Sequence, residues 1–152
     1  MSRGSSRPER KPLIALVDRA NRALQADMMR AAHRAGHEEI RPAHNAVFST
    51  LSAPEGERTV DLAQRAGITR QSMGEVVRDM VELGIVEMVP DPADGRAKLV
   101  RYTAEGREHT RLGFLHILDL EQRLTDEFGE DLEATRRVLD RVVAILGADS
   151  QD

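Results

Sequence analysis

The segment 59–78 constrains the fold most, because its residues fit two short helices that meet at a tight turn: TVDLAQRAGITRQSMGEVVR. Closely crossing helices need a small residue at the contact, and Ala63 supplies one. Four residues later Gly67 tolerates the positive φ that the turn needs. The apolar residues that would face a core are Leu62, Ala66, Ile68, Met73 and Val76. The segment therefore predicts a helix-turn-helix, with helices over 59–66 and about 70–83.

The pattern changes directly after these helices. Residues 85–89 and 98–102 are rich in β-branched and apolar side chains, which favour strands. Between them stands PDPADGR, whose Asp94-Gly95 pair is a strong hairpin signal. A hairpin that follows a helix-turn-helix forms a wing.

Apolar residues at helical spacing occur both before and after the helix-turn-helix and wing. Their spacing predicts a helix over 13–33, a second helix starting at Pro42, a fifth from the cap Thr103 to about Leu124, and a sixth over 130–146. Thr59 and Thr69 can cap the two helices of the motif. The expected fold class is mainly α with a small β-hairpin wing (α+β): a winged helix-turn-helix domain joined to a helical dimerisation region.

Composition excludes several classes of protein. The chain has 152 residues, no cysteine and only 3% aromatic residues. These numbers exclude a disulfide framework and argue against a binder that stacks bases of single strands. No apolar run approaches a membrane helix, and residues 1–12 lack the core of a secretory signal, so a cytoplasmic protein is expected. The motifs of phosphate loops and catalytic nucleophiles are missing, so neither an enzyme nor a cofactor is predicted.

The predicted wing contains the most specific sequence motif of the chain. Its sequence, DPADGRAKLVRYT, places Asp94 and Arg96 as an Asp-x-Arg pair before a strand that ends in Tyr-Thr. Over residues 13–146 the chain resembles the multiple-antibiotic-resistance regulator (MarR) family of transcription factors. The resemblance implies a homodimer that binds a palindromic DNA site and is usually released by a small effector, which is the behaviour of a ligand-responsive repressor.

The residues suggest how DNA would be bound. The helix at 70–83 should enter the major groove, where Arg70 can read guanine and Gln71 adenine. The other predicted DNA-binding residues are Arg58, Thr69, Ser72, Glu75, Arg78, Asp94, Arg96 and Lys98. Arg96 is expected in the minor groove, although an ion pair with Asp94 is an alternative. Gly74 inside this helix allows either close approach to DNA or tight packing.

The chain as a whole is expected to divide into four parts: a disordered basic tail (1–12), an N-terminal dimerisation helix (13–40), the winged region (41–102) and C-terminal dimerisation helices (103–147). The fifth helix is apolar nearly all round, so a partner chain should bury it. The resemblance suggests an effector cleft, for which His44 and Phe48 are candidates.

Two alternatives stay open. The histidines His33, His37 and His44 lie close in sequence and could hold a metal, although a glycine interrupts the helical spacing and no metal site is predicted. The net charge is −4 and the stretch 41–102 is nearly balanced in charge, so the winged region could bind a protein in place of DNA.

Overall fold

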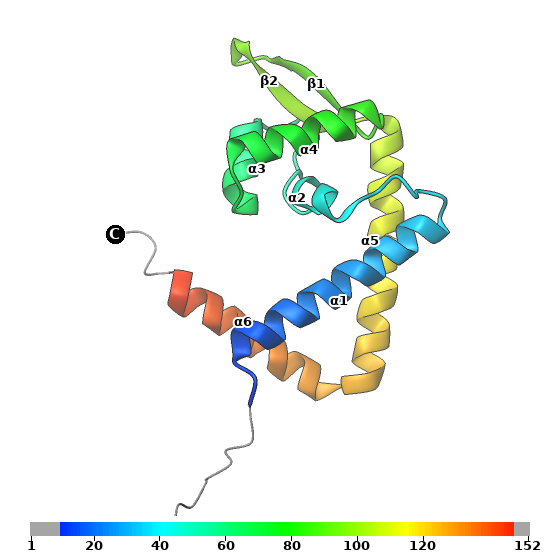
Figure 1. Ribbon diagram of the computed structural model, residues 1–152, viewed down its shortest axis with the longest axis vertical. Helices are drawn as coiled ribbons and strands as arrows, with labels where there is room; N and C mark the ends of the chain where they lie inside the picture. Colours follow the sequence, from blue (N-terminus) through cyan, green and yellow to red (C-terminus); the bar gives the residue numbers. More distant parts are fainter. Residues whose placement is uncertain (1–9, 148–152) are drawn as a thin grey trace, which may run out of the picture. The chain divides into compact units, whose positions relative to one another are not determined.

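The computed structural model describes residues 10–147, so residues 1–9 of the expected disordered tail lie outside it. The elements in chain order are α1 (Leu13–Arg34), the 3-10 turn η1 (Pro42–His44), α2 (Asn45–Phe48), α3 (Thr59–Ala66), α4 (Arg70–Glu82), β1 (Val86–Asp91), β2 (Asp94–Tyr102), α5 (Ala104–Phe128) and α6 (Glu130–Gly147). The predicted class, mainly helical with one antiparallel hairpin, is confirmed (Figure 1). The chain forms two compact units, one ending at Gly113 and the other beginning at Phe114.

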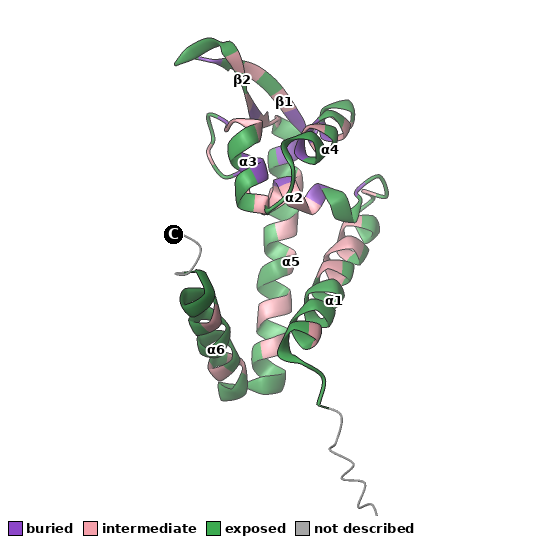
Figure 2. Ribbon diagram, turned by 60° about the vertical axis from the view of Figure 1, so that its left-hand side comes forward, coloured by how far each residue is buried: buried purple, intermediate pink, exposed green. Residues whose placement is uncertain are grey.

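The buried core belongs to the first unit. Figure 2 shows that buried residues concentrate in α2, α3, α4 and the hairpin, whereas α6 is mostly exposed. The core residues are Ile40, Val47, Leu51, Leu62, Ala63, Met73, Val77, Met80, Ile85, Val86 and Val100. Ala63 is buried at the helix crossing, as its small size requires. Ile68 was expected in the core but is exposed, and Val77 is more deeply buried than Val76.

Local signals set most helix boundaries. Gly67 ends α3 with a φ of +67°, and the side chain of Thr69 caps α4 by accepting a bond from the Ser72 amide at 3.0 Å. Thr103 caps α5 in the same way, through the Gly106 amide at 3.0 Å. The expected cap at Thr59 is wrong, because this residue is the first of α3 and Arg58 holds the cap position without a side-chain bond.

The hairpin is tighter than predicted. Its strands extend to Asp91 and from Asp94, so the turn lies at residues 92–93 and the Asp94-Gly95 pair begins β2. The reason is the Asp91 carboxylate, which accepts a hydrogen bond from the Ala93 amide at 2.8 Å and closes an earlier turn. The second predicted helix is likewise shorter: it begins as η1 at Pro42 and ends at Phe48.

Candidate DNA-binding site

The first turn of α4 presents polar side chains at a fixed position. Thr69 accepts from the Ser72 amide and donates from its own hydroxyl to the Ser72 Oγ at 2.8 Å. Both residues are exposed, as are Arg70 and Gln71 between them. The cap therefore defines where the helix starts and leaves its first side chains accessible to a ligand.

Glu75 lies one turn further along the exposed face. Its carboxylate accepts a long hydrogen bond, 3.4 Å, from the side-chain amide of Gln71. This bond orients the Gln71 amide towards Glu75.

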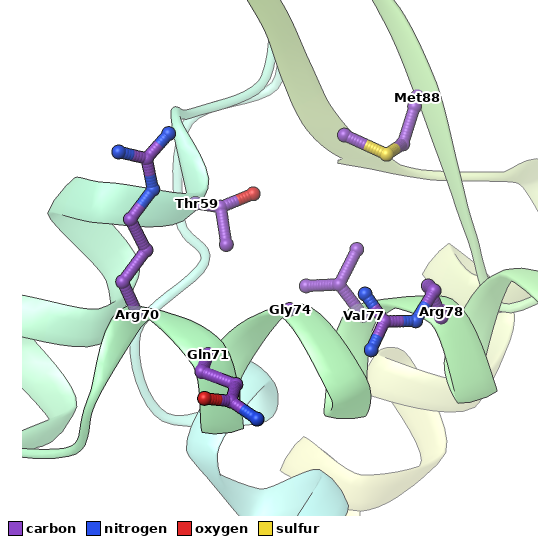
Figure 3. Close-up of a pocket in the computed structure, with 7 residues that line it drawn as sticks. All are labelled: Thr59, Arg70, Gln71, Gly74, Val77, Arg78 and Met88. Carbon is purple, nitrogen blue, oxygen red and sulfur yellow. The ribbon is translucent and has the colours of Figure 1, made fainter.

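A hollow of about 490 Å³ lies between α4, the start of α3 and β1. Figure 3 shows its lining: Thr59, Arg70, Gln71, Gly74, Val77, Arg78 and Met88. Arg70 and Arg78 stand near its two ends, Gly74 lies between them, and Met88 faces them from β1. Within residues 10–147, no hydrogen bond or ion pair occupies the guanidinium of either arginine. The hollow thus has two arginine side chains without protein partners, next to the apolar side chains of Val77 and Met88. Val77 and Met88 carry no sequence signal for this site. Val77 belongs to the buried core, and the register of the hairpin brings Met88 there.

An ion cluster anchors the base of the wing to α3. Arg58 donates to the buried Asp91 from Nε at 2.8 Å and from Nη2 at 2.6 Å. The same Nη2 lies 3.7 Å from the Oδ2 of Asp94. Hydrogen bonds from the Ala93 amide and from Arg58 hold the pKa of the Asp91 carboxyl below its usual range. Arg58 is therefore engaged by the protein itself, and its expected contact with phosphate stays a prediction.

The wing tip carries the remaining predicted residues. Asp94 accepts from the backbone amide of Arg96 at 3.2 Å, and in residues 10–147 no ion pair joins the side chains of Asp94 and Arg96. The alternative role of Arg96, an ion pair with Asp94, is thus not adopted, because Arg58 takes that position. Arg96 and Lys98 are exposed, with their charged groups open to solvent.

The rear of α4 is tied to the segment that follows α1. Asp79 receives hydrogen bonds on one oxygen from Arg41 and from the Nε2 of His44. His44 Nδ1 accepts from the Arg41 amide at 3.1 Å, which assigns the ring proton to Nε2. His44 and Arg41 together lower the pKa of Asp79. No short-range sequence signal identifies this cluster, because Asp79 lies 35 residues from His44 in the chain.

The two predicted effector-cleft residues have different surroundings. His44 is fully buried, with both ring nitrogens bonded within the protein. Phe48 is half-buried and stacks on His109 and Tyr102, with ring centroids 5.1 and 6.4 Å away. Burial lowers the pKa of His109 and raises that of Tyr102. In the described chain, His109 Nδ1 and the Tyr102 hydroxyl are buried without a hydrogen-bond partner.

The histidines considered as metal ligands have other partners. His33 donates to the Ile40 carbonyl at 3.1 Å, whereas His37 faces Glu39 at 3.3 Å and the ring of His109. Among residues 10–147, no group of three or more histidine and carboxylate side chains has the geometry to hold a metal ion.

The Asp91 carboxylate makes stability depend on pH. Because the folded pKa of Asp91 is depressed, its stabilisation is present above the ordinary pKa of about 3.9 and is lost as pH falls through the folded value. We expect Asp91→Asn to have a lower free energy of unfolding than the original chain at pH 7. This difference in free energy should disappear towards pH 2. Urea unfolding across this range measures it. Glu82→Gln, at an exposed carboxylate, is the control, and a gap that does not change with pH would contradict the assignment.

Comparison with known proteins gives one match by sequence and many by structure. The sequence model described as the MarR family matches residues 52–97, the part that contains α3, α4 and most of the hairpin. No curated protein matches the sequence. No helix among residues 10–147 has both the length and the apolar character needed to cross a membrane.

Three solved structures illustrate the structural likeness. Apo MarR from E. coli has a TM-score of 0.72 and 21% identity, covering 89% of this chain and 99% of its own. The transcriptional repressor CouR of Rhodococcus jostii RHA1, bound to a 23-mer DNA duplex, has a TM-score of 0.69, 22% identity and coverages of 88% and 92%. PcaV from Streptomyces coelicolor, in complex with its natural ligand, has a TM-score of 0.61, 27% identity and coverages of 93% and 98%.

Proposed function

We propose that this chain is a transcription regulator of the MarR family, which binds double-stranded DNA as a homodimer and represses transcription in the cytoplasm. The observation that carries the proposal is the set of unpaired cations that the winged unit exposes. Arg70 and Arg78 flank the hollow beside α4, and Arg96 stands at the wing tip. Cations without protein partners are free to bind phosphates or base edges.

In the proposed complex α4 occupies the major groove. Arg70 reads guanine and Gln71 reads adenine, while Glu75 accepts from cytosine or orients Gln71. Thr69, Ser72 and Arg78 contact phosphates. Arg96 enters the minor groove, and Lys98 holds the adjoining backbone. Arg58 and Asp94 contribute by fixing the wing. Arg58 also contacts a phosphate in the proposed complex.

The homodimer is supported by apolar side chains that the single chain leaves exposed. On α1 they include Ile14, on α6 Val143, and on α5 the four residues Phe114, Leu115, Ile117 and Leu118. An exposed helix that is apolar nearly all round requires a partner. We propose that residues 13–40 and 103–147 dimerise, which places two copies of α4 on half-sites of a palindrome about one DNA turn apart.

We also propose that a small molecule releases the DNA. PcaV was solved with its natural ligand, and it shares the fold of this chain. Phe48 and the buried polar atoms of His109 and Tyr102 are the groups that such a ligand could contact in this chain. Since His44 is fully buried and already bonded, it would act by positioning α4 through Asp79.

The alternative is a winged module that binds a protein, which the nearly balanced charge of residues 41–102 favours. Selection from a random duplex library, followed by anisotropy across a salt series, separates the two. A palindrome with half-sites one turn apart supports the proposed regulator. Failure to select any duplex, with no binding at low salt, would overturn it.

Arg78→Ala tests the phosphate contacts within that experiment. Each lost contact should reduce the slope of log affinity against log salt by about 0.9, so a dimer should lose about 1.8. Selection should return the same palindrome, because Arg78 is assigned to phosphate and carries no base readout. Arg137→Ala, at an exposed arginine of α6, should leave the slope unchanged. An unchanged slope for Arg78→Ala would remove this residue from the interface.

A further inference from the structure

Gly74 stands in the interior of α4, where glycine is the poorest helix former after proline. Its backbone does not require glycine. The glycines with positive φ are Gly36, Gly56, Gly67, Gly84 and Gly129, and Gly74 is not among them. A residue with a side chain would therefore fit the local conformation and stabilise the helix.

Packing does not require glycine at this position either. A Cβ built on Gly74 would meet only the Nη1 of Arg78, at 3.6 Å, which is an ordinary contact with the end of a flexible side chain. Gly106 shows what a packing requirement looks like, because its Cβ would lie 1.9 Å from the Ile85 carbonyl oxygen. The fold thus gives no reason for the missing side chain at position 74.

The surroundings of Gly74 indicate what lies against it. Arg70 and Arg78 are four residues before and after it, so all three share one face of α4. They line the hollow together with Val77 and Met88, and Figure 3 shows bare helix backbone between the two arginines. A ligand seated there meets positive charge at both ends and apolar carbon between them. A strand of DNA has the complementary chemistry, since it alternates phosphates with deoxyribose rings.

We infer that Gly74 is a DNA-contact residue. One strand of the bound duplex crosses the hollow in van der Waals contact with the backbone of α4 at Gly74, its deoxyribose facing Val77 and Met88. Arg70 and Arg78 reach the same strand from either side. The inference rests on the proposed function, and it assigns to position 74 a role in how deeply α4 enters the groove.

The test uses Gly74→Ala and Gly74→Leu in the full-length protein, with the duplex selected by the original chain. Both replacements are better helix formers, so each should raise the melting temperature, by about 3 °C for a chain of this size. Both should weaken DNA binding, Gly74→Ala by about tenfold and Gly74→Leu by more, as expected for overpacking a close contact. Opposite changes in stability and affinity cannot arise from misfolding.

The matched control is Gln64→Ala in α3, an exposed helix position outside the hollow and outside the proposed dimerisation segments, where alanine is likewise the better helix former. It should raise the melting temperature without changing DNA affinity. If Gly74→Ala leaves affinity within twofold, or lowers the melting temperature, the inference is wrong. If the original chain binds no duplex at all, the proposed function fails first, and the two failures are distinguishable.

Discussion

Leu118→Glu should convert the proposed dimer into a monomer and abolish tight binding to the palindrome. Leu118 is half exposed on α5, next to Phe114, Leu115 and Ile117, which are also exposed. Each copy would lose the burial of one leucine, about 2 kcal/mol, and would place a carboxylate in an apolar interface. A two-fold axis repeats the change, so the dissociation constant of the dimer should rise about a thousandfold or more.

Sedimentation velocity measures the monomer–dimer equilibrium, and anisotropy measures DNA binding. A monomer offers one α4 in place of two, so affinity for the full palindrome should fall to that for a single half-site. Leu118→Met preserves volume and apolar character and should remain dimeric. A dimer that survives Leu118→Glu would move the interface away from this face of α5, and an original chain that sediments as a monomer would contradict the homodimer itself.

Short-range signals in the sequence predicted much of the fold. The caps at Thr69 and Thr103 and the helix end at Gly67 are each made by residues within a few positions of one another, so their chemistry is readable from adjacent letters. The hairpin turn was placed wrongly for a similar reason. Two local signals competed, and the hydrogen bond from the Ala93 amide to Asp91 prevailed over the Asp94-Gly95 pair.

The contacts that the sequence could not predict join residues that are far apart in the chain. Arg58 donates to Asp91, 33 residues later, and fixes the wing, a contact that no neighbouring residue indicates. Asp79 meets His44 only because η1 packs behind α4. Met88 lines the hollow because of the register of β1 on β2. The sequence therefore indicates which residues share one exposed helix face, but it does not indicate which charged side chains the tertiary contacts leave without a partner.

Gly106 provides the clearest case of a residue whose role appears only in the structure. It is buried in the first turn of α5, and its amide donates to the Thr103 cap at 3.0 Å. The Ile85 carbonyl that its Cβ would strike also accepts from the Thr103 amide at 3.0 Å. The start of α5 therefore packs directly on the backbone that leads into β1, and only a residue without Cβ allows this approach.

Gly106→Ala should destabilise the protein strongly. A Cβ 1.9 Å from the Ile85 oxygen and 3.2 Å from the Tyr102 ring forces the helix away from the strand, because neither obstacle is a flexible side-chain end. We expect a loss of about 3 kcal/mol in the free energy of unfolding, even after the gain of up to about 1 kcal/mol in helix propensity. The melting temperature should fall by roughly 10 °C, measured by circular dichroism.

Gly113→Ala on the same helix separates the two contributions. It has the same gain in helix propensity without the collision, so it should stabilise the chain by up to about 1 kcal/mol. If alanine destabilises the protein at position 106 and stabilises it at position 113, the close approach of Gly106 to the Ile85 carbonyl, and not the loss of a glycine as such, determines the effect on stability. If Gly106→Ala matched Gly113→Ala in stability, the close packing of α5 on Ile85 would be incorrect. Since Tyr102 also stacks on Phe48, a helix displaced at Gly106 would alter the proposed effector contacts as well.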